Sequence, residues 1–487
     1  MNINSMVFVT AFLPVVFILD RLCLRQIKAK NVLLLIASLF FYAWGNPVYA
    51  LLLLCSVAVN YGIALLMDKT ASAQPAANAA ASAKAAAPKT ALSKAFLTAG
   101  ILLNIGLLCY YKYVDTALAF INKLSGSELF EITRQALPIG ISIFTFSSIA
   151  YLVDVYRGKY AAEKNFLHLA LYISFFAKVS VGPIARYDEF GPQLKERSVD
   201  TEKTMEGIRR FSYGLAKKML IANALGMYVD KVYGLDFGDV NTWMAWGAAV
   251  LYPLQLYYDF SGFSDMAVGL GKMFGFTICE NFDYPYLSGS VQEFWRRWHM
   301  SLGSWFRDYL YIPLGGSRKG KMRTYLNNMI VFAATGIWHG ATNGFLLWGL
   351  LQGVCIIAER LGLKKLLDKL GPVKYIYTFG VAAFGFVMFR LGDLAHALRY
   401  YKRMAMPWRY MEAHYAWQEL ITNRCLIAII AAVLGIGFWQ TFVKKHCPKI
   451  CALKGGLLEM IWCMALMAMS VLTLINSTYN PAIYLNF

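Results

Sequence analysis

Long apolar runs follow one another along almost the whole chain, and this feature constrains the fold most strongly. A helix needs about 20 mostly apolar residues to cross a bilayer. Segments that approach or meet this length are 5–20, 31–44, 48–67, 95–112, 136–155, 211–230, 242–258, 327–349, 375–391, 424–442 and 456–476. The chain is 58% hydrophobic and 15% charged, whereas soluble domains are about 45–50% apolar and about 25% charged. A soluble fold could not bury this excess, so the sequence predicts an all-α polytopic membrane protein with about eleven transmembrane helices.

Two shorter apolar stretches, 166–183 and 261–276, are expected to form re-entrant or amphipathic helices. Composition also suggests a division of the chain. N-terminal transmembrane helices occupy 1–67, and 68–94 are rich in Ala with some Lys and Pro. Such a composition is typical of a linker, which we expect on the cytoplasmic side. The remaining residues, 95–487, form the main body of the protein.

The charge balance indicates the orientation of the chain. Lys and Arg outnumber Asp and Glu by 47 to 28, which gives a net charge of +19. Cytoplasmic loops of membrane proteins carry such an excess. No recognisable nucleic-acid-binding module accompanies it, so we expect no nucleic-acid partner. The first apolar run lacks a signal-peptide cleavage site and is followed by Arg21, Arg25, Lys28 and Lys30. The positive-inside rule places this loop in the cytoplasm and the N-terminus outside.

The nine cysteines mostly stand alone inside apolar runs. The closest pair, Cys447 and Cys451, follows His446 in a Lys-rich loop. A metal site would need a second ligand pair nearby, and none is present in the sequence. An odd number of cysteines also disfavours a disulfide framework. The pattern therefore predicts no metal site and small apolar packing roles for most of the thiols.

One histidine, His339, stands in the otherwise apolar sequence IVFAATGIWHGATNGFLLWG. An ionisable side chain at membrane depth is costly and usually faces a cavity or the interior of the helix bundle. A neutral imidazole is a suitable general base near pH 7. A structural histidine, hydrogen-bonded to a neighbouring helix, fits the sequence equally well.

The segment 278–323 is too polar to span a membrane and too aromatic for a solvated loop. We expect interfacial helices, or helices that dip into the protein. The segment contains His299, and residues 296–323 carry seven basic side chains and one acidic one. Three interpretations are open: anchoring to lipid headgroups together with cytoplasmic topology, a dock for a phosphorylated donor such as coenzyme A, and a dock for an acidic carrier protein.

Acidic residues in apolar surroundings form a third unusual group. Asp259 and Asp265 lie six residues apart, which does not place them on one face of an unbroken helix, but Gly262 between them permits an unwound turn. For Asp265, and for Asp154 in IAYLVDVYRG, we expect buried hydrogen bonds or pairing with arginines of 296–307. A proton-coupled transporter could use intramembrane acids and a histidine as a relay, although we find no internal repeat of the kind that builds transporters.

Several longer motifs, taken in order, make the chain recognisable. They are LPIGISIFTFSSIAYLVDVYRG (137–158), VGPIARYDEF (181–190), YYDFSGFSDMAVGLGKMFGF (257–276), ENFDYPYLSGSVQEFWRRWHMSLGSWFRDYLYIPLGGSR (280–318), TGIWHG (335–340) and STYNPAIYLNF (477–487). With these motifs the chain resembles the membrane-bound O-acyltransferase superfamily, in its bacterial alginate O-acetylation branch. Lys178 is a departure from the pattern, because relatives usually carry an uncharged polar residue before the Gly-Pro of the second motif.

The resemblance implies a ring of transmembrane helices around a tunnel that joins a cytoplasmic donor side to an exterior funnel. It places the catalytic core and a tyrosine-bearing tail in 95–487. It also implies that His339 is the essential residue, usually assigned as general base, and that His299 is a second catalytic residue on the cytoplasmic side of the tunnel. Candidate donor-binding residues are then Arg296, Arg297, Trp298, Arg307 and Arg318, and candidates that line or support the tunnel are Asp259, Ser261, Asp265 and Trp338.

The implied reaction moves an acyl group, first of all acetyl, from a cytoplasmic thioester to a hydroxyl oxygen. The donor is acetyl-CoA or an acylated carrier protein, with no bound cofactor and no metal. The acceptor is an exported polysaccharide, either an alginate-like exopolysaccharide or peptidoglycan. The expected partners are membrane lipids and an extracytoplasmic SGNH-type acetyltransferase, and the expected location is the bacterial inner membrane. The close alternative in the same superfamily is D-alanyl transfer to teichoic acid from a carrier protein.

The C-terminal sequence adds a candidate acyl relay. Residues 482–487 read AIYLNF, which is similar to the Phe-x-Tyr-x-x-Phe tail of this branch, with Ala482 in place of the first aromatic residue. The resemblance implies that Tyr484 takes the acyl group at His339 and passes it to the exterior partner. An interfacial tyrosine that anchors the last helix is the alternative.

Overall fold

The structure is a computed structural model that describes residues 1–23, 26–70, 90–132, 136–412, 415–446, 455–481 and 483. Every regular element in these ranges is helical, which confirms the predicted all-α fold, and an isolated antiparallel bridge joins Phe282 to Trp298. Packing divides the chain into two units. The first contains Met1–Ile208 and Ala267–Cys279, and the second contains Arg209–Met266 and the described residues from Glu280 onward. Most of the predicted linker, and Tyr484, lie outside the described residues.

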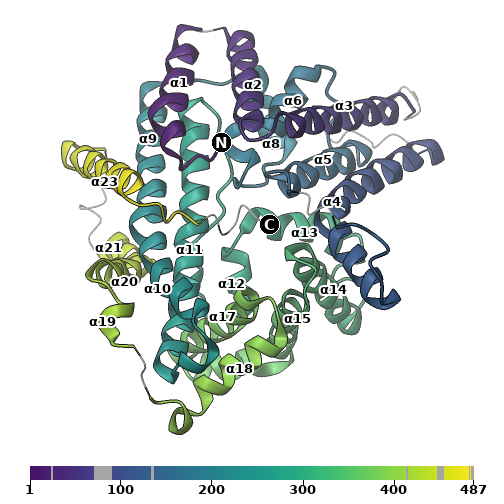
Figure 1. Cartoon of the computed structure of the whole chain (residues 1–487). Coiled ribbons are helices and arrows are strands. Elements are labelled where there is room, and N and C mark those ends of the chain that lie inside the picture. The colour runs from purple at the N-terminus through teal and green to yellow at the C-terminus, as the bar shows by residue number, and fades with distance from the viewer. Residues whose placement is uncertain are drawn as a thin grey trace. The chain divides into compact units, whose positions relative to one another are not determined.

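The first unit begins with helices that match the predicted apolar runs (Figure 1). Its elements are η1 (Phe8–Phe12), α1 (Leu13–Leu22), α2 (Ile27–Ala43), α3 (Pro47–Thr70), α4 (Ala91–Ser125), α5 (Ile141–Tyr156), α6 (Phe166–Ser174), α7 (Phe176–Val179), α8 (Tyr187–Lys195) and the first part of α9 (Thr201–Ala216). Helix α4 is much longer than predicted. Its first turn is capped by the Thr90 hydroxyl, which accepts from the N–H of Ser93, and it ends at Gly126 in left-handed backbone, a conformation that glycine adopts without strain.

Helices α3, α4 and α5 pack against one another, and a polar contact joins the first two. The Asn104 amide donates to the side-chain oxygen of Asn60 at 2.7 Å, and both residues are buried. Hydrogen bonds between asparagines are a recurrent way to hold transmembrane helices together.

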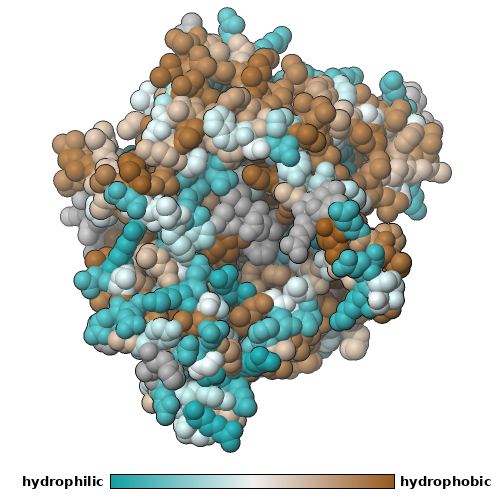
Figure 2. All heavy atoms as spheres, viewed as in Figure 1, coloured by the Kyte–Doolittle hydropathy of each residue, from teal (hydrophilic) through white to brown (hydrophobic). Residues whose placement is uncertain are grey.

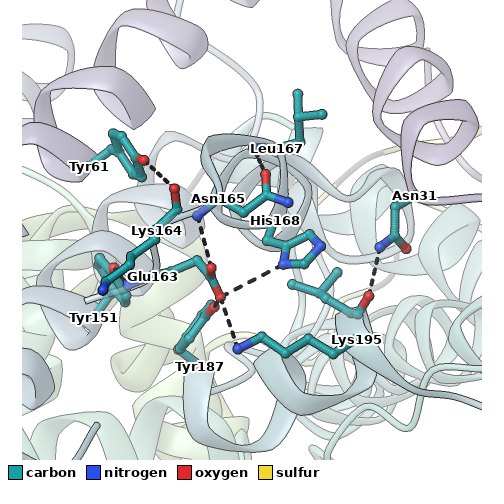
Figure 3. Close-up of polar contacts among 11 residues, drawn as sticks. Asn31, Tyr61, Tyr151, Glu163, Lys164, Asn165, Leu167, His168, Tyr187 and Lys195 are labelled. Carbon is teal, nitrogen blue, oxygen red and sulfur yellow. Dashed lines mark hydrogen bonds and ion pairs between the residues drawn. The ribbon is translucent and has the colours of Figure 1, made fainter. Parts of the chain in front are cut away.

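A polar cluster around Glu163 ties the α5–α6 loop to α8 (Figure 3). The carboxylate accepts hydrogen bonds from the Tyr187 hydroxyl at 2.5 Å and from the N–H of Asn165 at 2.9 Å. The oxygen that accepts from Tyr187 also lies 3.7 Å from the Lys195 amine and 3.8 Å from His168 Nδ1. A buried carboxylate is stable only when its oxygens are satisfied in this way. These contacts account for the burial of the Glu163 carboxylate.

Two residues that the sequence singled out lie elsewhere in this unit. Asp154 pairs with Lys159 at 3.5 Å and Arg157 at 3.9 Å, so the expected pairing with arginines of 296–307 is wrong for this residue. Lys178 is fully buried in α7, with its amine 4.6 Å from the centre of the Tyr172 ring. A cation over an aromatic face gains a favourable electrostatic contact.

The second unit holds the remaining helices (Figure 1). They are the last part of α9, η2 (Lys217–Ala222), α10 (Asn223–Gly234), η3 (Phe237–Asp239), most of α11 (Thr242–Met273), η4 (Pro285–Leu287), α12 (Val291–Arg297), α13 (Met300–Phe306), η5 (Arg307–Tyr311), α14 (Lys321–His339), α15 (Asn343–Ala358), η6 (Glu359–Leu363), α16 (Lys364–Lys369), α17 (Val373–Leu391), α18 (Leu394–Ala405), η7 (Pro407–Arg409), α19 (Trp417–Leu420), α20 (Asn423–Gly435), α21 (Phe438–His446) and α23 (Leu457–Asn476).

Helix α11 corrects two expectations about the acidic residues. It continues without a break through Gly262, where the missing side chain lets the helix approach the carbonyl oxygen of Gly214, so no unwound turn forms there and 261–276 is not a separate element. Asp265 pairs with Arg210 and Lys217, each at 2.7 Å, and not with arginines of 296–307. Its partners come from α9 and η2.

Four helices in the described residues are long and apolar enough to cross a membrane, or five if the bent pair α20–α21 counts as one span. They are α3, α4, the α15–α16 region Asn343–Lys369, and α23. Figure 2 shows hydrophobic side chains over α3, α4 and α23, as expected of surfaces that face lipid. The predicted count of about eleven spans is not reached by this criterion. The predicted span 327–349 is wrong, because α14 ends at His339 and α15 begins at Asn343.

Candidate active site

The second unit encloses a cavity of about 570 Å³. Its wall comes from three short elements of the basic aromatic segment (α12, α13 and η5) and from α14, α15 and η6. The lining residues are Gln292, Trp295, Arg296, Trp298, His299, Met300, Leu302, Gly303, Ser304, Phe306, Arg307, Tyr311, Asn328, Val331, Phe332, Thr335, His339, Trp348, Ile356 and Arg360. Of the two predicted locations for the segment 278–323, helices that dip into the protein describe this part of it best.

His339 reaches the cavity because α14 and α15 lie unusually close together. A side chain on Gly336 would place its Cβ 2.5 Å from the carbonyl oxygen of Phe345, and one on Gly349 would lie 2.3 Å from the carbonyl oxygen of Phe332. Small residues at such points let two helices pack backbone to backbone. The last residue of α14, His339, is thereby held against the first turns of α15.

Aromatic rings surround the His339 imidazole, which is 6% exposed. The ring centre lies 5.2 Å from Trp348 and 4.9 Å from Phe389, both in edge-on arrangements, and 4.4 Å from Trp338. These rings give the imidazole an apolar surround, and a neutral imidazole is the form that can accept a proton.

His299 lines the same cavity from the turn between α12 and α13. Its backbone is left-handed, with φ 46° and ψ 53°, which is uncommon for a residue with a side chain and concentrates at functional sites. The Phe260 ring meets the imidazole edge-on at 4.6 Å, and Nδ1 lies 3.1 Å from the side-chain oxygen of Asn281. Burial lowers the pKa of His299 well below its ordinary value, so the ring is neutral at physiological pH.

Three arginines give the cavity wall its charge. Arg296, Arg307 and Arg360 all line it and are exposed, and no Asp or Glu stands among the lining residues. Arg307 forms an ion pair with Asp308 at 2.8 Å. Arg296 and Arg360 form no ion pair with any described residue. One of the three, Arg307, lies in a π-helical turn, a rare feature that is often found at functional sites. Guanidinium groups arranged in this way suit a phosphate or carboxylate ligand.

The predicted site residues fall into three groups. Those that line the cavity together are His299, His339, Arg296, Trp298 and Arg307. Those described but not lining it are Arg297, Arg318, Asp259, Ser261, Asp265 and Trp338. Among these, Arg297 pairs with Glu293 at 2.8 Å, Asp259 pairs with Lys218, and the Trp338 ring lies tilted beside the His339 imidazole. Tyr484, the candidate relay, lies outside the described residues.

Sequence reasoning missed several members of the site. Trp295, Trp348 and Arg360 line the cavity, and the Trp295 indole donates to the side-chain oxygen of Gln352 at 3.2 Å. Arg360 has a sequence signal that could have found it, because Glu359-Arg360 is a charged pair directly after the apolar run of α15. Glu359 is buried and accepts from the N–H of Val291, which fixes the start of α12 and brings Arg360 to the cavity.

The cavity combines an apolar wall, two imidazoles and a cationic rim. In the part of the chain that the structure describes, no three His, Cys, Asp or Glu side chains gather as a metal site would require. The chemistry these side chains can provide is proton transfer at an imidazole and electrostatic binding of an anionic ligand. A membrane protein with this arrangement is suited to group transfer from an anionic donor.

Comparison with known proteins identifies the class. The model of the membrane-bound O-acyltransferase family matches residues 141–365. The chain is 35% identical to the probable alginate O-acetylase AlgI of Pseudomonas putida, over the full length of both proteins. It is 34% identical to the peptidoglycan O-acetyltransferase of Helicobacter pylori, over 82% of this chain and 79% of that protein. A teichoic acid D-alanyltransferase of Bacillus subtilis is 30% identical over 44% of this chain and 57% of its own length.

The chain therefore belongs to the membrane-bound O-acyltransferase family. It is an O-acyltransferase in the branch of the alginate O-acetylation proteins, as the motifs predicted. Membership of this family favours acyl transfer over the alternative of proton-coupled transport.

Proposed function

We propose that this chain moves acetyl groups from a cytoplasmic thioester across the membrane for O-acetylation of an exported polysaccharide, an alginate-like exopolysaccharide or peptidoglycan. Relatives that match most or all of the chain are named for these two reactions. The observation that carries the proposal is the meeting of His299 and His339 in one cavity with a rim of arginines.

In this proposal His339 is the general base. The acceptor hydroxyl oxygen attacks the thioester carbonyl carbon, a C–O bond forms and the C–S bond breaks. His339 takes the hydroxyl proton and returns it to the leaving thiolate, so the imidazole ends the step unchanged. General-base help of this kind is typically worth about 10²–10⁴-fold in rate. The apolar wall keeps water from competing for the thioester.

The proposed donor is acetyl-CoA, whose phosphates carry several negative charges. Arg296, Arg307 and Arg360 would bind these phosphates, since guanidinium groups pair with phosphate oxygens. The Trp298 side chain would contact the rest of the donor. The phosphates stay in water, and acetyl-CoA is on the cytoplasmic side, so in this proposal the arginine rim faces the cytoplasm. The membrane is the bacterial inner membrane, and the N-terminus lies outside.

The proposed route outward uses Tyr484 as an acyl relay. Its phenol would attack the thioester at His339 and carry the acetyl group as an ester. An extracytoplasmic transferase of the SGNH type would then move the acetyl group to the polysaccharide. Support comes from the contacts of the preceding residues: Asn223 donates to the carbonyl oxygen of Tyr479, and Lys218 donates to that of Pro481. These contacts attach Tyr479 and Pro481 to the second unit.

The test uses purified protein in liposomes and two labelled donors, acetyl-CoA and a D-alanylated carrier protein. We expect thiol release from acetyl-CoA and an acetyl ester on Tyr484 in a peptide map. Tyr484→Phe should form no ester, while its thermal stability stays that of the wild type. Thiol release from the carrier protein alone would favour D-alanyl transfer, and release without any tyrosine ester would contradict the relay.

A further inference from the structure

A short segment that precedes α12 holds the turn that carries His299. The N–H of Asp283 donates to the carbonyl oxygen of Arg297 at 3.0 Å, and the N–H of Met300 donates to that of Asn281 at 3.0 Å. Between these two bonds, Phe282 forms its bridge with Trp298. His299 is thus fixed from both sides in its left-handed conformation.

The side chain of Asn281 determines which nitrogen of the imidazole carries hydrogen. Asn281 is fully buried, and its side-chain oxygen accepts from the N–H of Ser301 at 3.2 Å and from the Ser301 hydroxyl at 2.9 Å. A backbone N–H can only donate, so the atom that faces it must be the amide oxygen. The same oxygen lies 3.1 Å from His299 Nδ1. Since an amide oxygen cannot donate, Nδ1 must be the protonated nitrogen.

We propose that Asn281 is a positioning residue that fixes His299 in the tautomer with hydrogen on Nδ1, so that Nε2 offers a lone pair to the donor in the cavity. Which ring nitrogen of a histidine carries hydrogen is commonly set by the partner of the other nitrogen. With Nδ1 occupied by Asn281, Nε2 is the nitrogen left for a ligand. Burial keeps the ring neutral, because it lowers the pKa of His299.

This inference rests on the proposed function, in which the donor is a thioester, and it names the part of the donor that His299 binds. A bare Nε2 accepts a hydrogen bond from N–H or O–H, and cannot donate one to a carbonyl oxygen or an oxyanion. Coenzyme A and carrier proteins both present the thioester on a pantetheine arm, which contains amide N–H groups. His299 therefore binds the arm of the donor, while His339 acts on the acceptor hydroxyl.

The charges around His299 are consistent with a neutral ring. Arg296, Arg307 and Arg360 share its cavity, and a nearby cation disfavours imidazolium. Carboxylates on the elements packed against it either have cationic partners or, in the case of Glu359, accept hydrogen bonds from the N–H groups of Val291 and Gln292. The pairs are Asp259 with Lys218, Asp265 with Arg210 and Lys217, Glu280 with Arg210, Asp283 with Arg297, Glu293 with Arg297, and Asp308 with Arg307.

The experiment compares Asn281→Asp with wild type by following thiol release from acetyl-CoA across pH. A carboxylate accepts from the same three donors, so the turn keeps its contacts, but its negative charge raises the pKa of His299. The ring then gains a proton as the pH falls, and Nε2 loses its lone pair. We expect the KM for acetyl-CoA to rise about three- to tenfold on the acidic side, the effect of losing one hydrogen bond, with little change in kcat. Wild type and the control Asn122→Asp, a half-buried residue near the end of α4, should lack this rise.

Two variants of the histidine keep the test decisive if Asn281→Asp does not fold. His299→Gln retains an acceptor oxygen and should keep a KM near that of wild type, whereas His299→Phe, which has none, should not. In the double variant Asn281→Asp with His299→Gln, the acidic rise in KM should disappear, because no imidazole is left to titrate.

The proposal for Asn281 would be overturned by a pH profile of Asn281→Asp that is parallel to that of wild type. Equal KM values for His299→Gln and His299→Phe would also overturn it. In both cases thiol release by wild type would still uphold the proposed function. If wild type releases no thiol from either class of donor, the proposed function fails, and the inference fails with it.

Discussion

The two cavity histidines are held by different means. His339 ends a regular helix and is fixed by contacts with aromatic rings, while His299 sits in left-handed backbone and is fixed by Asn281. The sequence could point to His339, because an imidazole in an apolar run is conspicuous. It could not point to Asn281, because the pairing of two short segments brings that side chain to the ring. Trp348 was likewise missed, since nothing in its own sequence separates it from other buried tryptophans.

At the scale of single residues, the Glu163 cluster predicts a pH-dependent stability. Burial alone would raise the pKa of Glu163, but hydrogen bonds from Tyr187 and Asn165, with the charges of Lys195 and His168, lower it below its ordinary value. A carboxyl whose pKa is lowered by folding stabilises the protein above its unfolded pKa, and this stability is lost as pH falls through the folded value.

The change that tests this is Glu163→Gln. At neutral pH we expect it to lower the free energy of unfolding by about 1–3 kcal/mol, the value of hydrogen bonds to a charged group. The difference from wild type should shrink as the pH falls below about 4, near the ordinary pKa of Glu. Thermal unfolding of both proteins in detergent at several pH values measures this difference in stability. The exposed Glu196→Gln should stay equal to wild type, and a difference that is constant with pH would contradict the assignment.

At the scale of elements, hydropathy predicted most helices but not where they break. The run 327–349 is apolar throughout, so it was predicted as one span, although the short sequence Gly340-Ala341-Thr342 ends α14 and starts α15. The acidic pairs were predicted in the wrong place for a similar reason: a sequence shows which charges exist, but not which helices bring them together. The cavity could not be predicted for the same reason, because one of its walls is formed by the packing of α14 against α15.

Gly336→Ala tests the close approach of these two helices. The added Cβ would lie 2.5 Å from the carbonyl oxygen of Phe345 and 3.0 Å from the Cα of Leu346, so the backbones must separate. We expect a loss of about 1–3 kcal/mol in stability, typical of overpacking, together with reduced thiol release. The matched control is Gly380→Ala in α17, where nothing lies within 4 Å and alanine should be neutral or stabilising. Equal stabilities of the two variants would contradict the packing argument.

At the scale of the whole molecule, the C-terminal strap, defined as Ser477–Pro481, lies mostly half-buried against polar residues of the second unit. Lys218 joins it to α11, because the buried amine pairs with Asp259 and also donates to the carbonyl oxygen of Pro481. Farther along the strap, the Tyr479 hydroxyl donates to Asp230, which pairs with Arg390 at 2.7 Å. The strap is therefore attached to this unit through Lys218 and Asp230.

Lys218→Met should disturb this arrangement strongly, because it leaves the Asp259 carboxylate buried without its cation. Removing one partner of a buried ion pair typically costs about 3–5 kcal/mol. We expect a lower melting temperature in detergent and faster proteolysis at the C-terminal end. The double variant Lys218→Met with Asp259→Leu should recover much of the stability, since no unpaired charge remains. A double variant no more stable than Lys218→Met would contradict the pairing.

The central claim, that His339 carries the acyl transfer, is tested most directly by thiol release from acetyl-CoA in liposomes containing His339→Ala. The matched control is His396→Ala, an exposed histidine of α18, and protein amounts are equalised. The account predicts that His339→Ala loses about 10²–10⁴-fold in rate, the contribution of a general base, while His396→Ala equals wild type. Release by His339→Ala at the wild-type rate would contradict it and leave His339 a structural residue.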